Sequence, residues 1–175
     1  TVVIEVIPNM ETSVERAHFN MVEQQVRPWD VTDQRVLEVM AEVARERFVP
    51  NAYRNLAFAD IEIPITAEQT MLPPRIIGRM LQALDIKRDD RILEIGTGTG
   101  YATACLSRLG GRVVSMEIHQ ELAAQAQTLL QELNLRRLEV IVGDALEGQV
   151  EGYPFDVIAV TGSLPDDASL AALQA

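Results

Sequence analysis

Four short apolar runs in the second half of the chain constrain its fold more than any other feature. They are RILEIG (91–96), RVVSMEI (112–118), LEVIVGD (138–144) and FDVIAVTG (155–162). The segments 101–109 and 119–134, which separate the first three runs, carry apolar residues at helical spacing. Apolar strands that alternate with helices are typical of a parallel sheet covered on both faces. The pattern predicts a doubly wound, mostly parallel α/β fold, with a ligand site beyond the carboxyl ends of the strands.

The first half of the chain lacks this alternation and is predicted to form helices and loops. Apolar residues at helical spacing predict one helix over 32–44 and another from Pro73 to Leu84. The stretch between them mixes prolines with short apolar alternation, which predicts irregular structure with a short strand at 61–63. The predicted organisation is a tail over 1–18, a helical, substrate-side extension over 19–88 and an α/β core over 89–175.

The two ends of the chain carry expectations of their own. Met10 has the context of a natural start, which gives the hypothesis that residues 1–9 are an upstream artefact. The segment 165–175 has the composition of a helix that follows the fourth strand. Four strands would leave an edge where a fifth ought to pair. The core is therefore predicted to be truncated before its last strands.

Composition argues against several classes of protein. The net charge of −11 over 175 residues argues against a protein that grips a nucleic-acid backbone, and it would tolerate a cationic ligand. No apolar run approaches the length of about 18 residues that a membrane span needs. The single cysteine, Cys105, excludes internal disulfides and provides no metal cluster, so a cytoplasmic protein without a metal site is expected.

A glycine-rich turn, GTGTG, separates the first strand from the helix that follows it. Gly96, Gly98 and Gly100 permit positive φ and leave room for a ligand to approach N–H groups at the start of the helix. A plain tight turn would need one glycine, not three at alternate positions. The spacing also differs from the dinucleotide pattern G-x-G-x-x-G, because Tyr101 stands where that pattern has its third glycine. The turn therefore favours a ligand other than a dinucleotide.

Three acidic residues stand at or near the ends of successive strands. Glu94 precedes the glycine turn, where its charge would repel a pyrophosphate and attract an ammonium or sulfonium group. Glu117 ends the second strand and can accept hydrogen bonds from both hydroxyls of a ribose, while Asp144 ends the third and can reach an adenine amino group. Each also has a simpler interpretation, as a polar strand residue, a solvated strand end and a turn former respectively. Together they favour a nucleoside with a positively charged tail, and S-adenosylmethionine is that ligand.

Longer stretches of the sequence resemble a known family. RILEIGTGTGYATACLSRLGGRVVSMEI (91–118) is similar to the cofactor region of the protein-L-isoaspartate O-methyltransferases, and the segments 21–40, 45–60 and 151–165 are similar to other parts of that family. The resemblance implies a Rossmann-like, S-adenosylmethionine-dependent methyltransferase fold whose last strands this chain would lack. It also implies methyl transfer to the carboxylate of isoaspartyl residues in proteins, as protein repair.

The same resemblance implies roles for individual residues. The glycine turn would line the methionine end of the cofactor, Glu117 would bind the ribose, and Asp144 with Ala145 would flank the adenine. Thr161, at the end of the fourth strand, would lie near the site of transfer. The predicted cofactor-binding residues are Glu94, Gly96, Thr97, Gly98, Gly100, Glu117, Ile118, Asp144 and Ala145.

One segment departs from the family pattern. The family carries G-x-G-Q-T-I-S with its serine at the substrate site, whereas the aligned stretch here is TAEQTML. Leu72, at the serine position, cannot donate a hydrogen bond to a carboxylate, and Glu68 adds a negative charge near the path of an anionic substrate. Gln69 and Thr70 are kept and, with Thr161, are the substrate-side candidates; no catalytic residue is assigned.

Three functions are compared on this basis. The first is an S-adenosylmethionine-dependent O-methyltransferase that acts on isoaspartyl residues of protein or peptide substrates. The alternative is an S-adenosylmethionine-binding protein of this fold with a different acceptor or no turnover, which Leu72 motivates. The third is a nicotinamide-dependent oxidoreductase, against which Tyr101 and Glu94 argue.

Overall fold

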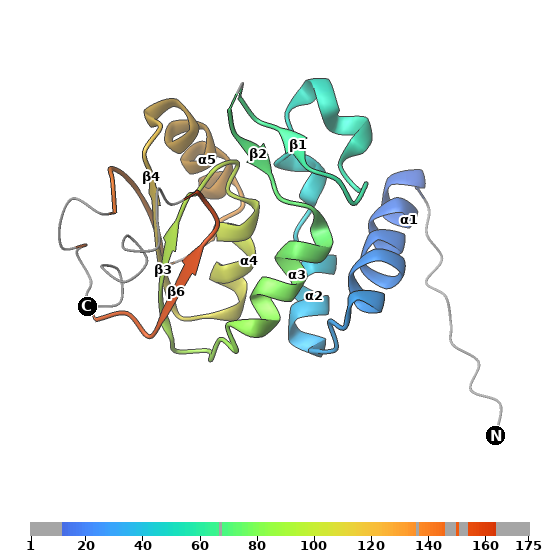
Figure 1. The fold of residues 1–175 in the computed structure, drawn as a ribbon, viewed down its shortest axis with the longest axis horizontal. Helices are drawn as coiled ribbons and strands as arrows, with labels where there is room; N and C mark the ends of the chain where they lie inside the picture. Colours follow the sequence, from blue (N-terminus) through green and yellow to red (C-terminus); the bar gives the residue numbers. More distant parts are fainter. Residues whose placement is uncertain (1–11, 67, 136, 146–149, 151–153, 164–175) are drawn as a thin grey trace.

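The sheet predicted for the second half of the chain is present, and its strands run parallel (Figure 1). The computed structural model describes residues 12–163 with the exception of 67, 136, 146–149 and 151–153. The strands of the sheet are β3 (Arg91–Ile95), β4 (Arg112–Glu117), β5 (Leu138–Val142) and β6 (Val157–Val160). They pair in the order β5-β4-β3-β6, and each lies within one of the predicted apolar runs. The predicted doubly wound α/β fold is confirmed.

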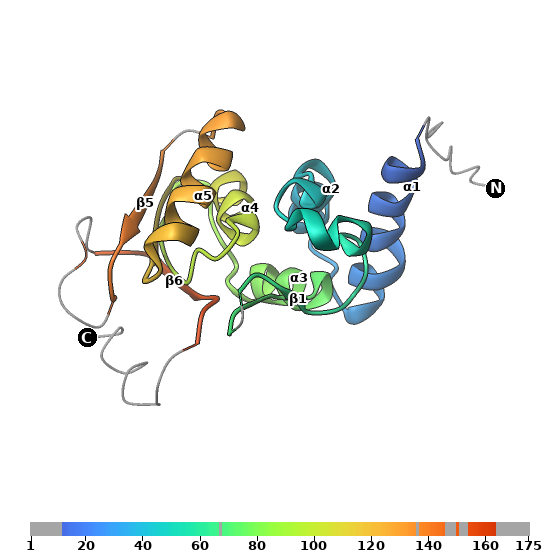
Figure 2. The same cartoon turned by 90° about the horizontal axis from the view of Figure 1, so that it is seen from above.

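The sheet has two apolar faces because successive strand residues point to opposite sides. Ile92 and Val113 belong to the large core on the side of two helices, α4 (Tyr101–Leu109) and α5 (Gln120–Glu132). Figure 2 shows these helices between the sheet and the N-terminal helices. Leu93 and Val114 form a second, smaller buried cluster on the opposite face. The helix predicted over 165–175 lies outside the described residues.

The N-terminal extension combines helices, short helical turns and a small hairpin. The helices described in it are α1 (Ser13–Asn20), α2 (Gln34–Glu42) and α3 (Pro74–Ala83), and the hairpin consists of β1 (Ile63–Pro64) and β2 (Thr70–Met71). Shorter helical turns cover Met21–Val26, Arg27–Trp29, Arg45–Arg47 and Asn51–Leu56. The helices predicted over 32–44 and from Pro73, and a short strand near 61–63, are thus present, while α1 and β2 are additions to the prediction.

Helix α1 begins inside the segment predicted as a tail, 1–18. The Thr12 hydroxyl accepts a hydrogen bond from the Glu15 N–H, and the Glu15 carboxylate accepts one from the Thr12 N–H, both at 3.1 Å. This reciprocal cap satisfies two of the N–H groups that a helix start leaves unpaired. The helical extension therefore starts earlier than residue 19, and the rest of the tail, 1–11, lies outside the described residues.

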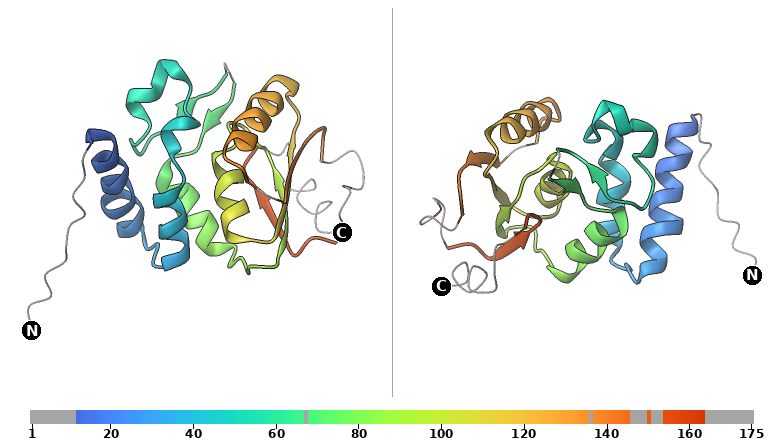
Figure 3. Two further views of the ribbon diagram at one scale, coloured as in Figure 1. Left: turned by 180° about the vertical axis from the view of Figure 1, so that it is seen from behind. Right: turned by 45° about the horizontal axis from the view of Figure 1, so that its top comes forward.

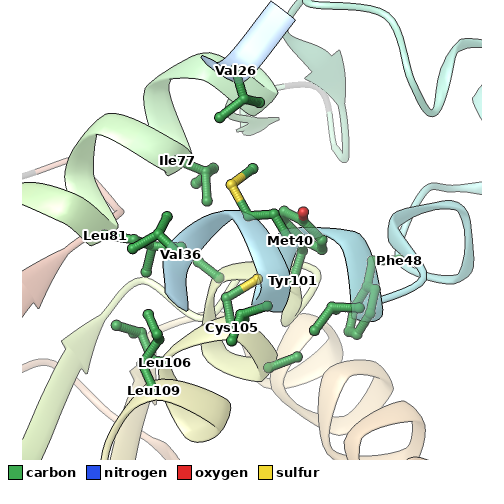
Figure 4. Close-up of a cluster of buried hydrophobic side chains, with 14 of the residues drawn as sticks. Val26, Val36, Met40, Phe48, Ile77, Leu81, Tyr101, Cys105, Leu106 and Leu109 are labelled. Atoms are coloured by element: carbon green, nitrogen blue, oxygen red, sulfur yellow. The ribbon is translucent and has the colours of Figure 1, made fainter. Parts of the chain in front are cut away.

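One continuous cluster of buried apolar side chains joins the extension to the α/β core. Helix α2 contacts both α3 and α4, and Figure 3 shows the same arrangement from two further sides. In Figure 4, Met40 of α2 lies near Ile77 of α3 and above Cys105 of α4. Because close-packed cores transmit position, the extension is held in a fixed place relative to the turn that precedes α4.

The described residues contain neither a membrane span nor a metal cluster. None of their helices is both long and apolar enough to cross a bilayer. They hold no group of three or more His, Cys, Asp and Glu side chains placed to bind a metal ion.

Candidate active site

The glycine turn between β3 and α4 has a conformation that requires glycine. Gly96, Gly98 and Gly100 have φ values of +100°, +53° and +88°, a region that residues with a Cβ rarely adopt. A Cβ on Gly96 would also overlap the backbone nitrogen of Gly162, just after β6. The Gly96 N–H donates a hydrogen bond of 2.8 Å to the carbonyl oxygen of Met116 in β4. The turn therefore packs directly against the carboxyl ends of its neighbouring strands.

The carboxylate of Glu117, the last residue of β4, is held by backbone donors on both oxygens. Its Oε2 accepts a hydrogen bond of 2.8 Å from the Gly98 N–H, and its Oε1 accepts one of 3.0 Å from the His119 N–H. The residue is only 5 % exposed. These contacts fix one orientation of the side chain, and each carboxylate oxygen keeps a lone pair for a ligand hydroxyl.

A cavity of about 280 Å³, the larger cavity, lies along the ends of β3, β4 and β5. Its volume is close to the lower end of the roughly 300–1,000 Å³ that small-molecule sites occupy. Among the predicted residues, it is lined by Gly96, Glu117, Ile118, Asp144 and Ala145. Ile118 lies at the rim and is 61 % exposed, whereas Glu117 and Ala145 are buried. The structure thus brings the predicted ribose and adenine residues to one cavity.

A smaller cavity of about 60 Å³ adjoins the glycine turn on the side of the hairpin. All three substrate-side candidates line it, namely Gln69, Thr70 and Thr161. Leu72 lines it as well. Thr97, Gly98 and Glu117 contribute to the same lining, and Gln69 and Glu117 line both cavities. Its remaining wall is largely apolar, with Met71 and Ile77 beside Leu72.

The tip of the hairpin carries the residues that stand in place of the two glycines. The Thr66 hydroxyl accepts hydrogen bonds from the N–H groups of Glu68 at 3.3 Å and Gln69 at 3.2 Å. The Ile65 N–H donates to the Gln69 carbonyl oxygen at 2.8 Å. Glu68 is exposed and lines neither cavity. Thr66 therefore shapes the turn, and the charge of Glu68 lies outside the cavities.

Glu94 is fully buried behind the glycine turn. Its Oε2 accepts hydrogen bonds from the hydroxyls of Thr103 at 2.5 Å and Ser115 at 2.7 Å, and its Oε1 accepts one from Thr161 at 3.3 Å. The Ser115 hydroxyl lies 2.6 Å from that of Thr97 in the turn. This network links α4, β4 and the end of β6 through one carboxylate. Because the side chain has no contact with water, burial raises the pKa of Glu94 from 4.5 to about 7.

Two residues of the predicted cofactor set lie apart from both cavities. Neither Glu94 nor Gly100 lines the larger or the smaller cavity. Gly100 packs against α5, where a Cβ would meet Leu130 at 3.3 Å and Ala126 at 3.4 Å. The contact of Glu94 with a cationic tail stays a prediction. In the structure, Glu94 contacts buried hydroxyls next to the glycine turn.

The sequence patterns leave out several residues of this site. Thr99, Gly162 and Ser163 line the cavities, and two buried hydroxyls, Thr103 and Ser115, bind Glu94. The signal for Ser115 is a lone polar residue within an apolar strand, because a buried hydroxyl needs a hydrogen-bond partner. The cavity-lining residues carry no comparable signal.

Comparison with known sequences identifies one family. The sequence model described as Protein-L-isoaspartate(D-aspartate) O-methyltransferase (PCMT) matches residues 15–168. A protein-L-isoaspartate O-methyltransferase of Koribacter versatilis is 44% identical over 146 residues, which are 83% of this chain and 66% of that protein. One of Opitutus terrae is 41% identical over 165 residues, 92% of this chain and 71% of that protein. The chain thus spans about two thirds of the length of these curated relatives.

Solved structures share the fold of this chain. A protein-L-isoaspartate O-methyltransferase structure superposes with a TM-score of 0.71 and 27% identity, and the match covers 84% of this chain and 47% of that one. A second structure, from Plasmodium falciparum and in complex with S-adenosyl-L-homocysteine, gives a TM-score of 0.75 at 20% identity and covers 89% of this chain and 78% of that one. Matches this long include both the extension and the sheet, and the part of the chain that forms the sheet has the Rossmann-like methyltransferase fold.

Proposed function

Because the chain belongs to the protein-L-isoaspartate(D-aspartate) O-methyltransferase family, we propose that the protein transfers a methyl group from S-adenosylmethionine to the carboxylate of isoaspartyl residues, as protein repair. The observation that carries the proposal furthest is the hydrogen bond between the Gly98 N–H and the Glu117 carboxylate. It holds an acid suited to a ribose against the turn, at a point where both cavities meet.

The residues of the larger cavity fit the nucleoside part of S-adenosylmethionine. Glu117 offers two oriented oxygens to the paired hydroxyls of a ribose. Asp144 and Ala145 would flank the adenine, with Ile118 at the open rim. The glycine turn differs from the dinucleotide pattern, because Tyr101 stands where that pattern has its third glycine. These features support S-adenosylmethionine as the cofactor.

The residues around the smaller cavity would position the acceptor. When bound, S-adenosylmethionine supplies a methyl group on a positively charged sulfur, which is already activated for transfer. An isoaspartyl carboxylate is ionised at neutral pH, so the chain needs no general base and its task is orientation and exclusion of water. Gln69 and Thr70 would orient the acceptor from the hairpin, and Leu72 would keep water away. The Thr161 hydroxyl donates to the Gly96 carbonyl oxygen at 2.6 Å and so fixes the end of β6 against the turn.

The proposed partners are proteins and peptides that contain isoaspartyl residues. The net charge of −11 disfavours nucleic acid as a partner. A cytoplasmic location is part of the proposal, and the single cysteine, which is buried and free, supports a reducing compartment.

Two measurements on the purified protein test the proposal. Titration calorimetry with S-adenosylhomocysteine should give micromolar binding, and labelled methyl transfer should occur to an isoaspartyl peptide and not to the same peptide with normal aspartate. Binding without transfer would overturn the isoaspartyl activity and favour a different acceptor. Absence of binding would overturn the cofactor as well.

A further inference from the structure

A buried arginine stands behind the smaller cavity. Arg45 is 0 % exposed. Its Nε donates to the Ala57 carbonyl oxygen and its Nη2 donates to the Leu72 carbonyl oxygen, both at 2.9 Å. Its guanidinium carbon lies 4.8 Å from the centre of the Tyr101 ring, and its Nη1 has no hydrogen-bond partner among the described residues. The side chain joins three separate segments, and both N–H donors of its Nη1 are unused among the described residues.

The positive charge of Arg45 has no acidic partner in the described part of the chain. No carboxylate there forms an ion pair with it, and the neighbouring Asp60 is paired with Arg75. Burial of an unpaired charge is unfavourable, and burial lowers the pKa of the Arg45 guanidinium. An arginine nevertheless stays protonated near neutral pH. The folded protein therefore buries the charged guanidinium of Arg45 at some cost in stability.

The location of this charge suits an anionic acceptor. Leu72 and Tyr101, which Arg45 contacts directly, both line the smaller cavity. The charge thus lies one residue behind the cavity wall, where the low polarity of the surroundings strengthens its field. Since the chain as a whole carries −11, a negatively charged acceptor needs a local positive potential to enter.

We propose that Arg45 is a positioning residue that selects an anionic acceptor, because it fixes the Leu72 carbonyl at the cavity wall and supplies the positive charge that a carboxylate needs there. The inference rests on the proposed function and adds the residue that makes the smaller cavity prefer a carboxylate to its neutral amide. It also gives a carboxylate a source of attraction where Leu72 offers no hydroxyl.

Two peptides that differ only in the charge of the acceptor test this inference. With S-adenosylhomocysteine bound, dissociation constants are measured for an isoaspartyl peptide and for the same peptide with isoasparagine. The wild type should bind the carboxylate about tenfold more tightly or better. Arg45→Met should reduce this preference to about twofold or less, while Arg45→Lys keeps the charge and should keep most of the preference. Arg47→Met is the matched control, because Arg47 belongs to the same helical turn but is exposed and paired with Glu132 at 2.9 Å.

The outcomes separate a charge effect from a structural one. Affinity for S-adenosylhomocysteine and thermal unfolding check that each variant is folded, and Arg45→Gln replaces Arg45→Met if the latter does not fold. An equal loss of affinity for both peptides in the neutral variants overturns the inference, and so does a wild type without preference. Methyl transfer by the wild type tests the proposed function separately, so intact transfer without charge preference contradicts only the inference.

Discussion

The carboxylate of Glu117 and the backbone N–H of Gly98 are joined by a hydrogen bond of 2.8 Å, so the end of β4 and the turn after β3 are fixed to one another. A ligand that binds its hydroxyls to Glu117 and lies along the turn would meet groups that are already oriented. Such preorganisation lowers the entropy cost of binding. We therefore expect affinity to depend on the negative charge of Glu117 rather than on the size of its side chain.

Glu117→Gln tests this dependence with little change in shape. The amide loses the charge that strengthens hydrogen bonds from ligand hydroxyls, and its NH2 would face one of the two backbone N–H donors. Hydrogen bonds to charged groups contribute about 1.5–3 kcal/mol. Affinity for S-adenosylhomocysteine, measured by calorimetry, should fall by about 10- to 100-fold. Glu139→Gln is the control and should leave the affinity unchanged. Glu139 is an exposed residue of β5 that forms an ion pair with Arg112 of β4. Equal affinities for the wild type and Glu117→Gln would contradict the assigned role.

Gly96→Ala is expected to destabilise the fold strongly. The residue has a φ of +100°, and a Cβ there would overlap the backbone nitrogen of Gly162. Backbone strain of this kind costs about 1–3 kcal/mol, and the overlap adds to it, so urea unfolding should show a loss of about 2 kcal/mol or more. Gly143→Ala is the control, because its Cβ would meet the Met116 methyl at an ordinary 3.6 Å. A loss in Gly96→Ala no larger than in this control would contradict the packing described.

The α/β core could be predicted because each of its strands carries its own signal. β3 and β4 are short apolar runs bounded by polar turns, and such runs are recognised without knowledge of their neighbours. Helix α1 is harder to recognise, because none of its residues is buried and its main sequence signal is the cap formed by Thr12 and Glu15. β2, only Thr70–Met71, exists through its pairing with β1, and the order β5-β4-β3-β6 depends on contacts between distant segments.

The candidate site also contains residues whose place could be predicted from the sequence and residues whose place could not. The sequence places Glu117 and Asp144 at strand ends, and the carboxyl ends of parallel strands meet at one edge. It places Glu94 on a strand but does not reveal what faces it, because Thr103 comes from the following helix and Ser115 from the neighbouring strand. Which hydroxyls donate to Glu94 depends on how α4 and β4 pack against β3. The burial of Glu94 therefore could not be predicted from the sequence.

Glu94 should make the stability of the protein depend on pH. Its pKa is about 7 in the folded chain and 4.5 ordinarily. The folded state therefore binds this proton more tightly, and the stability it contributes is complete below about pH 4.5 and is lost as the pH rises through about 7. The difference between the two pKa values corresponds to on the order of 3 kcal/mol.

Glu94→Gln removes this titration and keeps the shape of the side chain. Its amide oxygen can accept from Thr103 and Ser115 in place of Oε2. By urea unfolding without ligand, the variant should exceed the wild type in stability at pH 8 and lie close to it at pH 5. Glu42→Gln, at an exposed position of α2, is the control for how the loss of any one glutamate changes the pH dependence of stability. Parallel pH curves for the wild type and Glu94→Gln would contradict the titration of Glu94.

Leu72→Ser tests what the apolar wall does to a carboxylate acceptor. Leu72 lines the smaller cavity and packs partly against the main core. A serine would place an O–H donor at the wall, and a hydrogen bond to a charged acceptor contributes about 1.5–3 kcal/mol. We expect kcat/KM for an isoaspartyl peptide to rise by about tenfold. The free energy of unfolding should fall by about 1–3 kcal/mol, because buried apolar contacts are lost.

Leu72→Ala separates the hydroxyl from the loss of volume. It removes the same contacts with the core and adds no donor, so it should lose stability to a similar extent without any gain in kcat/KM. Labelled methyl transfer with both variants and the wild type measures the difference. If serine and alanine change kcat/KM equally, the missing hydroxyl does not limit the reaction. Both variants keep the backbone carbonyl that accepts the hydrogen bond from Arg45, so the charge behind this wall is the same in each of them.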